Sequence, residues 1–152
     1  MAKLLMIYAS MSGNTEDMAK EIEAGIRSKK ESVDVLEAFE TDASAMEAYE
    51  GILIGTYTWG DGDLPDELLD FYEDMKQLDL TGKKAAVFGS FDSSYGDDGI
   101  AVDQMRDALQ RQGAEIVQEE LKVELSPTPD DRALCREFGE RFAENWHAVK
   151  KL

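Results

Sequence analysis

The stretch Leu4-Leu5-Met6-Ile7-Tyr8-Ala9-Ser10-Met11-Ser12-Gly13-Asn14-Thr15 carries the strongest fold signal in the chain. Its first six residues form a short apolar run, which is typical of a strand buried on both faces. A helix is predicted from Asn14 to Ser28, because Met18, Ile22 and Ile26 recur every four residues along one face. A buried strand followed by a polar loop and an amphipathic helix predicts the start of an α/β fold.

The alternation of apolar runs and amphipathic stretches continues along the chain. Further strands are predicted at Val33–Leu36, Ile52–Gly55, Ala85–Gly89 and Ile116–Leu125. Further helices are predicted at Ala43–Tyr49, from Pro65 through Met75, around Val102–Leu109, and along a C-terminal stripe of Cys135, Phe138, Phe142, Trp146 and Val149. This alternation predicts a single α/β domain over residues 1–152, with helices on both faces of a five-stranded parallel sheet.

Composition argues against several functional classes. The formal net charge of −17 disfavours nucleic-acid binding and favours partners with a basic surface. No apolar run reaches the roughly 20 residues of a membrane span or resembles a signal peptide, so we expect a cytoplasmic protein without membrane attachment. Cys135 is the only cysteine and is expected to be a buried structural thiol. His147 is the only histidine, and neither a metal site nor a catalytic nucleophile is predicted.

Three predicted loops follow the carboxyl ends of strands, at Ser10–Thr15, Thr56–Asp66 and Ser90–Gly99. Ligands of open parallel sheets bind outside these ends, where the strand order reverses. If the first and third strands flank the reversal and the fourth lies beside the third, the three loops converge on one crevice. The second and third loops are long for a compact domain, which is typical of functional loops.

The first loop is rich in uncharged groups that bind anions. It offers hydroxyls, an amide side chain and backbone N–H groups, and the helix that follows adds a partial positive charge. Its spacing matches neither a P-loop nor a dinucleotide-binding fingerprint. We therefore interpret it as a phosphate site without Lys or Arg. The alternative is an ordinary helix cap, with Asn14 as N-cap and Asp17 three residues later.

Each of the other two loops presents an aromatic residue among turn-forming and acidic residues. Trp59 lies in the second loop and Tyr95 in the third. Two aromatic side chains from adjacent loops can stack on both faces of one flat ring, each contributing about 0.5–1.5 kcal/mol beyond area burial. The alternative is a pair of surface aromatics with no ligand.

Together, Ser10-x-Ser-Gly-Asn-Thr15, Thr56-Tyr-Thr-Trp-Gly-Asp61 and Asp92-Ser-Ser-Tyr95 resemble the three flavin loops of the flavodoxin family. The resemblance spans the whole chain. It implies a flavodoxin-like fold with strand order 2-1-3-4-5, in which FMN lies where the order reverses between the first and third strands. The predicted fifth strand has no insertion, so the chain is similar to short-chain flavodoxins.

The resemblance also implies roles for individual residues. The first loop would hold the FMN phosphate, Trp59 and Tyr95 would cover the two flavin faces, and Asp92 and Gly99 would lie near the pyrimidine edge. Met11, Tyr57 and Phe91 depart from the family pattern. The expected FMN-binding set is Ser10, Met11, Ser12, Gly13, Asn14, Thr15, Thr56, Tyr57, Thr58, Trp59, Gly60, Asp61, Ser90, Phe91, Asp92, Tyr95 and Gly99.

In function, the resemblance implies a low-potential one-electron carrier that uses the semiquinone/hydroquinone couple of non-covalent FMN, rather than a stand-alone enzyme. A flip of the Gly60–Asp61 peptide would stabilise the semiquinone, because glycine adopts positive φ at little cost. Acidic residues on the loops would lower the potential and dock a flavodoxin/ferredoxin reductase and acceptor redox enzymes through their basic patches. A monomer is expected.

Two alternatives belong to other classes. An FMN-dependent NAD(P)H:quinone reductase needs an open flavin face for its substrates, and Trp59 and Tyr95 would block both faces. A receiver-type signalling domain needs an acidic pair after the first strand and an Asp after the third. This chain has Ser10-Met11 and Thr56-Tyr57 at those points.

Overall fold

The computed structural model describes residues 3–10, 13–58, 64–95 and 98–150, without the side chains of Asp66, Glu67, Tyr95 and residues 146–150. Its strands are β1 (Leu4–Tyr8), β2 (Val33–Glu37), β3 (Gly51–Tyr57), β4 (Lys84–Phe91), β5 (Glu115–Ile116) and β6 (Leu121–Glu124). Its α-helices are α1 (Asn14–Ser28), α2 (Asp66–Met75), α3 (Ile100–Arg111) and α4 (Pro129–Lys150). Short 3₁₀ helices are η1 (Ala38–Glu40), η2 (Ala43–Ala48) and η3 (Ser93–Tyr95).

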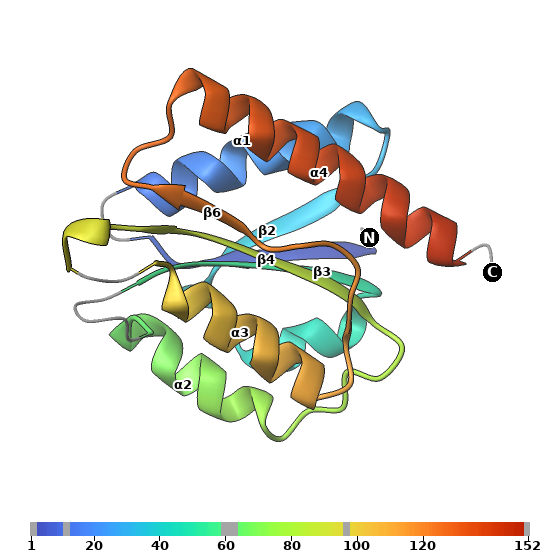
Figure 1. Ribbon diagram of the computed structural model, residues 1–152. Helices are drawn as coiled ribbons and strands as arrows, with labels where there is room; N and C mark the ends of the chain where they lie inside the picture. Colours follow the sequence, from blue (N-terminus) through green and yellow to red (C-terminus); the bar gives the residue numbers. More distant parts are fainter. Residues whose placement is uncertain (1–2, 11–12, 59–63, 96–97, 151–152) are drawn as a thin grey trace.

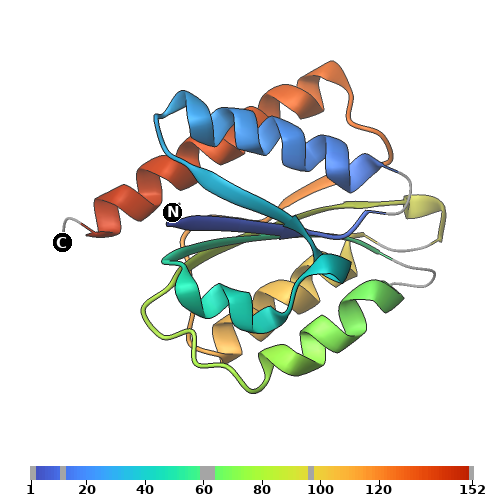
Figure 2. The same ribbon diagram turned by 180° about the vertical axis from the view of Figure 1, so that it is seen from behind.

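The sheet has the predicted order, β2-β1-β3-β4-β5, and every strand pair in it is parallel. Helices α1 and α4 cover one face, and α2 and α3 cover the other (Figures 1 and 2). Because the strands are parallel, their carboxyl ends lie along one edge, which we call the carboxyl edge. The strand order reverses between β1 and β3.

The predicted fifth strand is divided into two segments that pair with β4 at different places. β5 pairs near the start of β4, and β6 pairs from Phe88 to Phe91. Between them, polar side chains hold the backbone away from the ladder. The Gln118 Nε2 amide donates to the carbonyl of Phe138 on α4 at 3.0 Å, and Arg106 Nη1 on α3 donates to Glu120 at 2.5 Å. Long-range polar contacts therefore interrupt a strand that its apolar pattern predicts as continuous.

The core consists of two apolar clusters separated by the sheet. Leu5 and Ile7 of β1 belong to the cluster under α2 and α3, whereas Leu4 and Met6 belong to the cluster under α1 and α4. All five residues of β1 are buried, which confirms the prediction of a strand covered on both faces. At roughly 25 cal/mol per Å² of apolar surface, this burial is the main favourable term of folding.

Close contact between α1 and α4 depends on two glycines. A Cβ built on Gly139 of α4 would overlap the backbone carbonyl of Ile22 on α1. A Cβ on Gly25 of α1 would overlap the carbonyl of Arg136 on α4. The two helices therefore approach backbone to backbone. Cys135 packs in the same region, and burial raises the pKa of its thiol to about 12, as expected for a structural cysteine.

A capping box begins α4 after the short segment that follows β6. The backbone N–H of Asp131 donates to Thr128 Oγ1 at 3.1 Å, and the backbone N–H of Thr128 donates to Asp131 Oδ2 at 3.0 Å. Each side chain thus satisfies a backbone donor that the helix itself leaves unpaired. This cap fixes where the chain turns from the carboxyl edge back over the sheet.

Candidate functional site

The described ends of all three predicted loops lie together at the carboxyl edge, on the left in Figure 1. Ser10 follows β1, Thr58 follows β3, and Asp92 with η3 follows β4. Because β1, β3 and β4 are neighbours in the sheet, the loops converge as the strand order requires.

The first loop enters α1 through a glycine cap, so the assignment of Asn14 as N-cap is wrong. Gly13 is the N-cap residue, with φ of 91°, and has no side chain to cap the helix. Asn14 is already helical, and its Oδ1 accepts a hydrogen bond from Ser126 Oγ at 3.0 Å. The amide of Glu16 donates to Ser10 Oγ, and that of Asp17 donates to the Gly13 carbonyl. The amides of Asn14 and Thr15 have no acceptor among the described residues.

Buried polar residues of the described chain gather beneath this loop. Thr15, Thr56 and Ser90 are 1%, 0% and 5% exposed, and they are the polar residues in the buried class. The hydroxyl oxygens of Thr15 and Ser90 lie 2.8 Å apart, and Thr15 Oγ1 lies 3.3 Å from the Thr56 carbonyl oxygen. Because burying polar groups is costly, such a cluster is typical of a functional site.

The hydroxyl of Thr58 has no partner among the described residues, although it is buried. The backbone N–H of Thr58 donates to the carbonyl of Ser90 at 3.3 Å, which places this residue beside the end of β4. A buried polar group without a hydrogen bond costs about 1–3 kcal/mol. Such a hydroxyl, at the same edge of the sheet as the amides of Asn14 and Thr15, fits a ligand that supplies an oxygen acceptor.

Side-chain hydrogen bonds hold the third loop in place. Asp92 Oδ1 accepts from the backbone N–H of Ser94 at 2.9 Å and from its hydroxyl at 2.6 Å, and these bonds hold the pKa of Asp92 below its usual value. The backbone N–H and hydroxyl of Ser93 both donate to Glu124 Oε2 of β6. The carboxylate of Asp92 therefore stays ionised while it caps η3.

Gly99 begins α3 with a left-handed backbone, at φ of 86°, and is buried. The aliphatic stem of Lys122 lies against the position that a Cβ would occupy there. The ammonium group of Lys122 is held by Asp103 Oδ2 at 3.0 Å. A cation of β6 thus packs beside the third loop, although the loop itself contains none.

The two long loops begin later than predicted. The ladder between β3 and β4 continues through the pairs Thr56–Gly89 and Tyr57–Ser90, so four predicted loop residues, Phe91 included, belong to strands. Gly89 allows this geometry, because a Cβ there would overlap the Thr56 carbonyl. The half-buried ring of Tyr57 packs against the core cluster under α2 and α3.

Several expected residues lie outside the part of the chain that the structure describes. They are Met11, Ser12, Trp59, Gly60, Asp61 and the side chain of Tyr95. Conversely, Glu124 and Ser126 contact the loops although sequence reasoning did not select them. No local motif marks these two residues. Their position after β6, beside β4, is the signal that would have indicated them.

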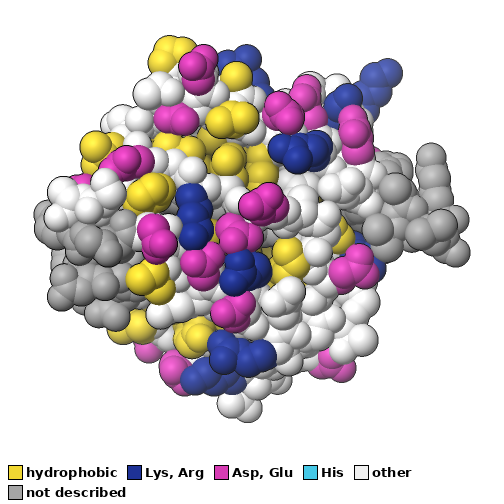
Figure 3. Space-filling view, in the orientation of Figure 1, with side chains coloured by type: hydrophobic (Ala, Val, Ile, Leu, Met, Phe, Trp, Pro, Cys, Tyr) yellow, Lys and Arg dark blue, Asp and Glu magenta, His cyan; other side chains and the backbone are white. Residues whose placement is uncertain are grey.

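Exposed large hydrophobic residues lie near the carboxyl edge. Phe39 and Leu125 closely follow β2 and β6, Ile100 begins α3, and Leu69 and Leu134 lie in the first two turns of α2 and α4. Figure 3 shows hydrophobic and acidic side chains interspersed near this end of the visible face. These residues belong to elements on both faces of the sheet, and each offers exposed apolar area at the end of the molecule where the three loops lie.

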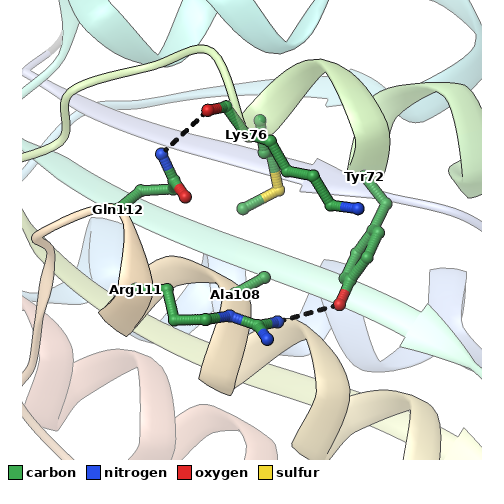
Figure 4. A pocket seen from close by; sticks show the side chains of 6 residues that line it. Tyr72, Lys76, Ala108, Arg111 and Gln112 are labelled. Atoms are coloured by element: carbon green, nitrogen blue, oxygen red, sulfur yellow. Dashed lines mark hydrogen bonds between the residues drawn. The ribbon is translucent and has the colours of Figure 1, made fainter.

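A small pocket lies at the other end of the molecule, between the carboxyl ends of α2 and α3 (Figure 4). It is lined by Tyr72, Met75, Lys76, Ala108, Arg111 and Gln112 and has a volume of about 150 Å³. Arg111 donates to the Tyr72 hydroxyl at 2.9 Å. Ligand pockets usually measure about 300–1,000 Å³, and cations at helix carboxyl ends are explained by the helix dipole. We therefore assign no ligand to it.

Other kinds of site find no support in the described part of the chain. It contains no group of three or more acidic, His or Cys side chains placed to hold a metal ion. None of its helices has the length and apolar character needed to cross a membrane.

Comparison with known proteins yields consistent matches. A family model described as Flavodoxin matches residues 6–139. Probable flavodoxin 1 of Bacillus subtilis (strain 168) is 49% identical over 143 residues, covering 93% of this chain and 90% of the relative. Oxidised Flavodoxin 1 from Bacillus cereus, a crystal structure, matches with a TM-score of 0.91 at 53% identity and covers 94% of this chain and 98% of its own.

A short-chain flavodoxin associated with a non-canonical PDU bacterial microcompartment also matches. Its TM-score is 0.88 at 32% identity, over 95% of this chain and 98% of its own. The similarity thus extends over nearly the whole length of these proteins, in sequence and in structure.

Proposed function

Because this chain belongs to the flavodoxin family, whose members bind FMN and carry electrons, we propose that it is a low-potential one-electron carrier with its FMN at the carboxyl edge. The observations that carry this placement are the buried hydroxyl of Thr58 after β3 and the amides of Asn14 and Thr15 after β1, none of which has a partner among the described residues. These groups are all hydrogen-bond donors. They fit a phosphate or another anionic oxygen group without requiring a cation.

The proposed phosphate cradle is formed by Ser10, Gly13, Asn14 and Thr15, together with Met11 and Ser12. The backbone amides point from the first turn of α1, where the helix dipole adds a partial positive charge. Gly13 suits this position because its left-handed φ is accessible to glycine, and a Cβ there would meet no other atom. The cradle thus selects an anion by geometry rather than by net charge.

When bound, FMN supplies the one-electron chemistry, and the role of the protein is to bind, orient and tune it. We propose that Trp59 and Tyr95 cover the two flavin faces and exclude water. Asp92 holds η3 in place through Ser94, so the loop that carries Tyr95 is fixed before the cofactor binds. Acidic residues on the loops disfavour added negative charge and would make the carrier strongly reducing.

We further propose that redox partners dock at the carboxyl edge. Exposed Phe39, Ile100 and Leu125 provide apolar contact area there, and the acidic loops attract a basic surface on a reductase or acceptor. Such a contact brings the partner to the end of the molecule where FMN is placed. The receiver-type alternative is wrong, because the chain is a flavodoxin and has no acidic pair after β1.

FMN binding tests the function directly. Purified apo-protein is expected to take up one FMN per chain, quench its fluorescence and become yellow, because the flavin is stacked between aromatic side chains. The loaded protein alone is expected to oxidise NAD(P)H only slowly, since both flavin faces are covered. Absence of FMN uptake would overturn the proposal, whereas rapid NAD(P)H oxidation with quinone would favour the reductase alternative.

Replacing Thr58 with valine tests the role of its buried hydroxyl. Valine keeps the shape and removes a buried group that has no partner among the described residues, so the apo-protein should become more stable by about 1 kcal/mol. The same change removes a hydrogen bond to the ligand, and the Kd for FMN should rise about tenfold. Urea unfolding and fluorescence titration measure these opposite effects. Loss of both stability and affinity would contradict a ligand-binding role for this hydroxyl.

A further inference from the structure

We infer that Ser90 is a positioning residue, whose hydroxyl donates to Thr15 Oγ1 and thereby frees the Thr15 proton for the phosphate of the cofactor. This inference rests on the proposed placement of FMN at the carboxyl edge. It gives Ser90, which the resemblance places in the FMN-binding set, an indirect role through Thr15.

The location of Ser90 ties the three loops together. Its side chain lies 2.8 Å from Thr15 Oγ1 in the first turn of α1, and its carbonyl accepts the backbone N–H of Thr58 after β3. Ser90 itself lies near the end of β4, just before the third loop. Since Ser90 and Thr15 are 5% and 1% exposed, water does not compete for their hydrogen bond.

The direction of the hydrogen bonds follows from the number of protons. Each hydroxyl has one proton, and the Thr56 carbonyl can only accept. If Thr15 donates to Thr56, Ser90 must donate to Thr15. The opposite direction leaves the Ser90 proton without an acceptor among the described residues and also loses the bond to Thr56. The chain of donation therefore runs from Ser90 to Thr15 to the carbonyl of Thr56.

The bond from Thr15 to Thr56 is the weak link in this chain. At 3.3 Å it exceeds the usual 2.5–3.0 Å of an O–H···O bond, whereas the Ser90–Thr15 bond is of ordinary length. An anionic phosphate oxygen is a stronger acceptor than a carbonyl, so it can take the Thr15 proton. Ser90 keeps donating to Thr15 during this exchange, which holds the oxygen in place and polarises its O–H.

A double-mutant cycle with two ligands tests this inference. Ser90→Ala should raise the Kd for FMN about fivefold and leave the Kd for riboflavin, which lacks the phosphate, within about twofold. In a Thr15→Val background, Ser90→Ala should cause no further loss of FMN affinity, because the relaying hydroxyl is absent. Fluorescence titration of the apo-protein measures each Kd. Ser32→Ala serves as the control, since it removes an exposed serine hydroxyl just before β2, away from the carboxyl edge.

The outcomes separate the possible roles of Ser90. Equal loss of FMN and riboflavin affinity, or equal loss with and without Thr15, would show a merely structural role and overturn the inference. If Ser90→Ala does not fold, Ser90→Cys keeps the volume and a weak donor, and must still weaken FMN more than riboflavin. If the wild-type protein binds FMN and the Ser90→Ala variant binds it with the same Kd, only this inference is overturned. Wild-type protein that binds neither flavin overturns the proposed function as well.

Discussion

Replacing Gly139 with alanine is expected to destabilise the protein by about 2 kcal/mol or more, although helix propensity alone predicts the opposite sign. In an exposed helix, alanine is more favourable than glycine by about 0.5–1 kcal/mol. Here the new Cβ overlaps the carbonyl oxygen of Ile22, a backbone atom that cannot rotate away. The helices α1 and α4 must separate, and the packing beneath them loosens.

The cost of separation arises from the large shared core of these helices. Met18 and Ile22 of α1 and Phe138 and Phe142 of α4 belong to the same buried cluster. A gap of about 0.5–1 Å forfeits a quarter to a half of the dispersion energy of each contact across it. Overpacking of this kind typically costs about 1–3 kcal/mol, and the lost contacts add to it.

Urea and thermal unfolding of the apo-protein measure the effect. A loss of about 2 kcal/mol should lower Tm by about 4–8 °C for a domain of this size. Gly25→Ala should behave in the same way, since its Cβ would overlap the Arg136 carbonyl. Glu137→Ala is the control on α4, because its ion pair with Arg141 is exposed. A stability of Gly139→Ala equal to that of the control would show that α1 and α4 tolerate greater separation.

Features that depend on residues close together in the sequence were predicted well, whereas features that depend on residues far apart were not. The pattern of β1 and α1 is decided by local periodicity, and both elements have the predicted boundaries to within a residue. The break between β5 and β6 was missed, because it depends on Phe138 and Arg106, which lie far away in sequence. Apolar content predicts which residues prefer burial. It does not predict which polar partners draw a segment out of the ladder.

The same distinction applies to the site. The positions of the three loops were predicted, because they follow from strand ends, whereas the roles of Trp59 and Tyr95, which the family resemblance implies, stay a prediction. The helix cap was assigned to Asn14 on local grounds, but Ser126, from the segment between β6 and α4, occupies its side chain. The hydroxyls of Thr15 and Ser90 and the backbone carbonyl of Thr56 come from three elements, so no local window could show that they meet. Their convergence is visible only in the fold.

Neutralising four loop acids is expected to raise the more negative of the two FMN potentials by on the order of 100 mV. The change is Asp61, Asp63, Asp97 and Asp98 to asparagine. The electron of the second reduction step would add a negative charge at the carboxyl edge, where the loops contain no Lys or Arg. At about 10 Å and an effective dielectric constant of about 40–80, each acid opposes that charge by roughly 0.4–0.8 kcal/mol.

The sum of these four interaction energies determines the expected shift in the potential. About 1.4 kcal/mol corresponds to about 59 mV for a one-electron couple. Salt dependence provides a second test of the electrostatic explanation. The Debye length falls from about 10 Å at 0.1 M salt to about 3 Å at 1 M, so salt screens the interaction between the acids and the flavin. The difference between variant and wild type should therefore shrink strongly at 1 M NaCl. Asp92 is left unchanged, because its hydrogen bonds to Ser94 hold η3 in place.

A matched variant separates local electrostatics from net charge. Changing Glu31, Glu47, Asp74 and Glu144 to their amides alters the net charge equally, but these residues lie toward the opposite end of the molecule. Spectroelectrochemical titration of the FMN-loaded proteins should show a small shift for this variant. Equal shifts in the two variants would mean that overall charge, rather than the loops, sets the potential. No shift in either would show that the site is insulated from its acids and that other contacts make the carrier reducing.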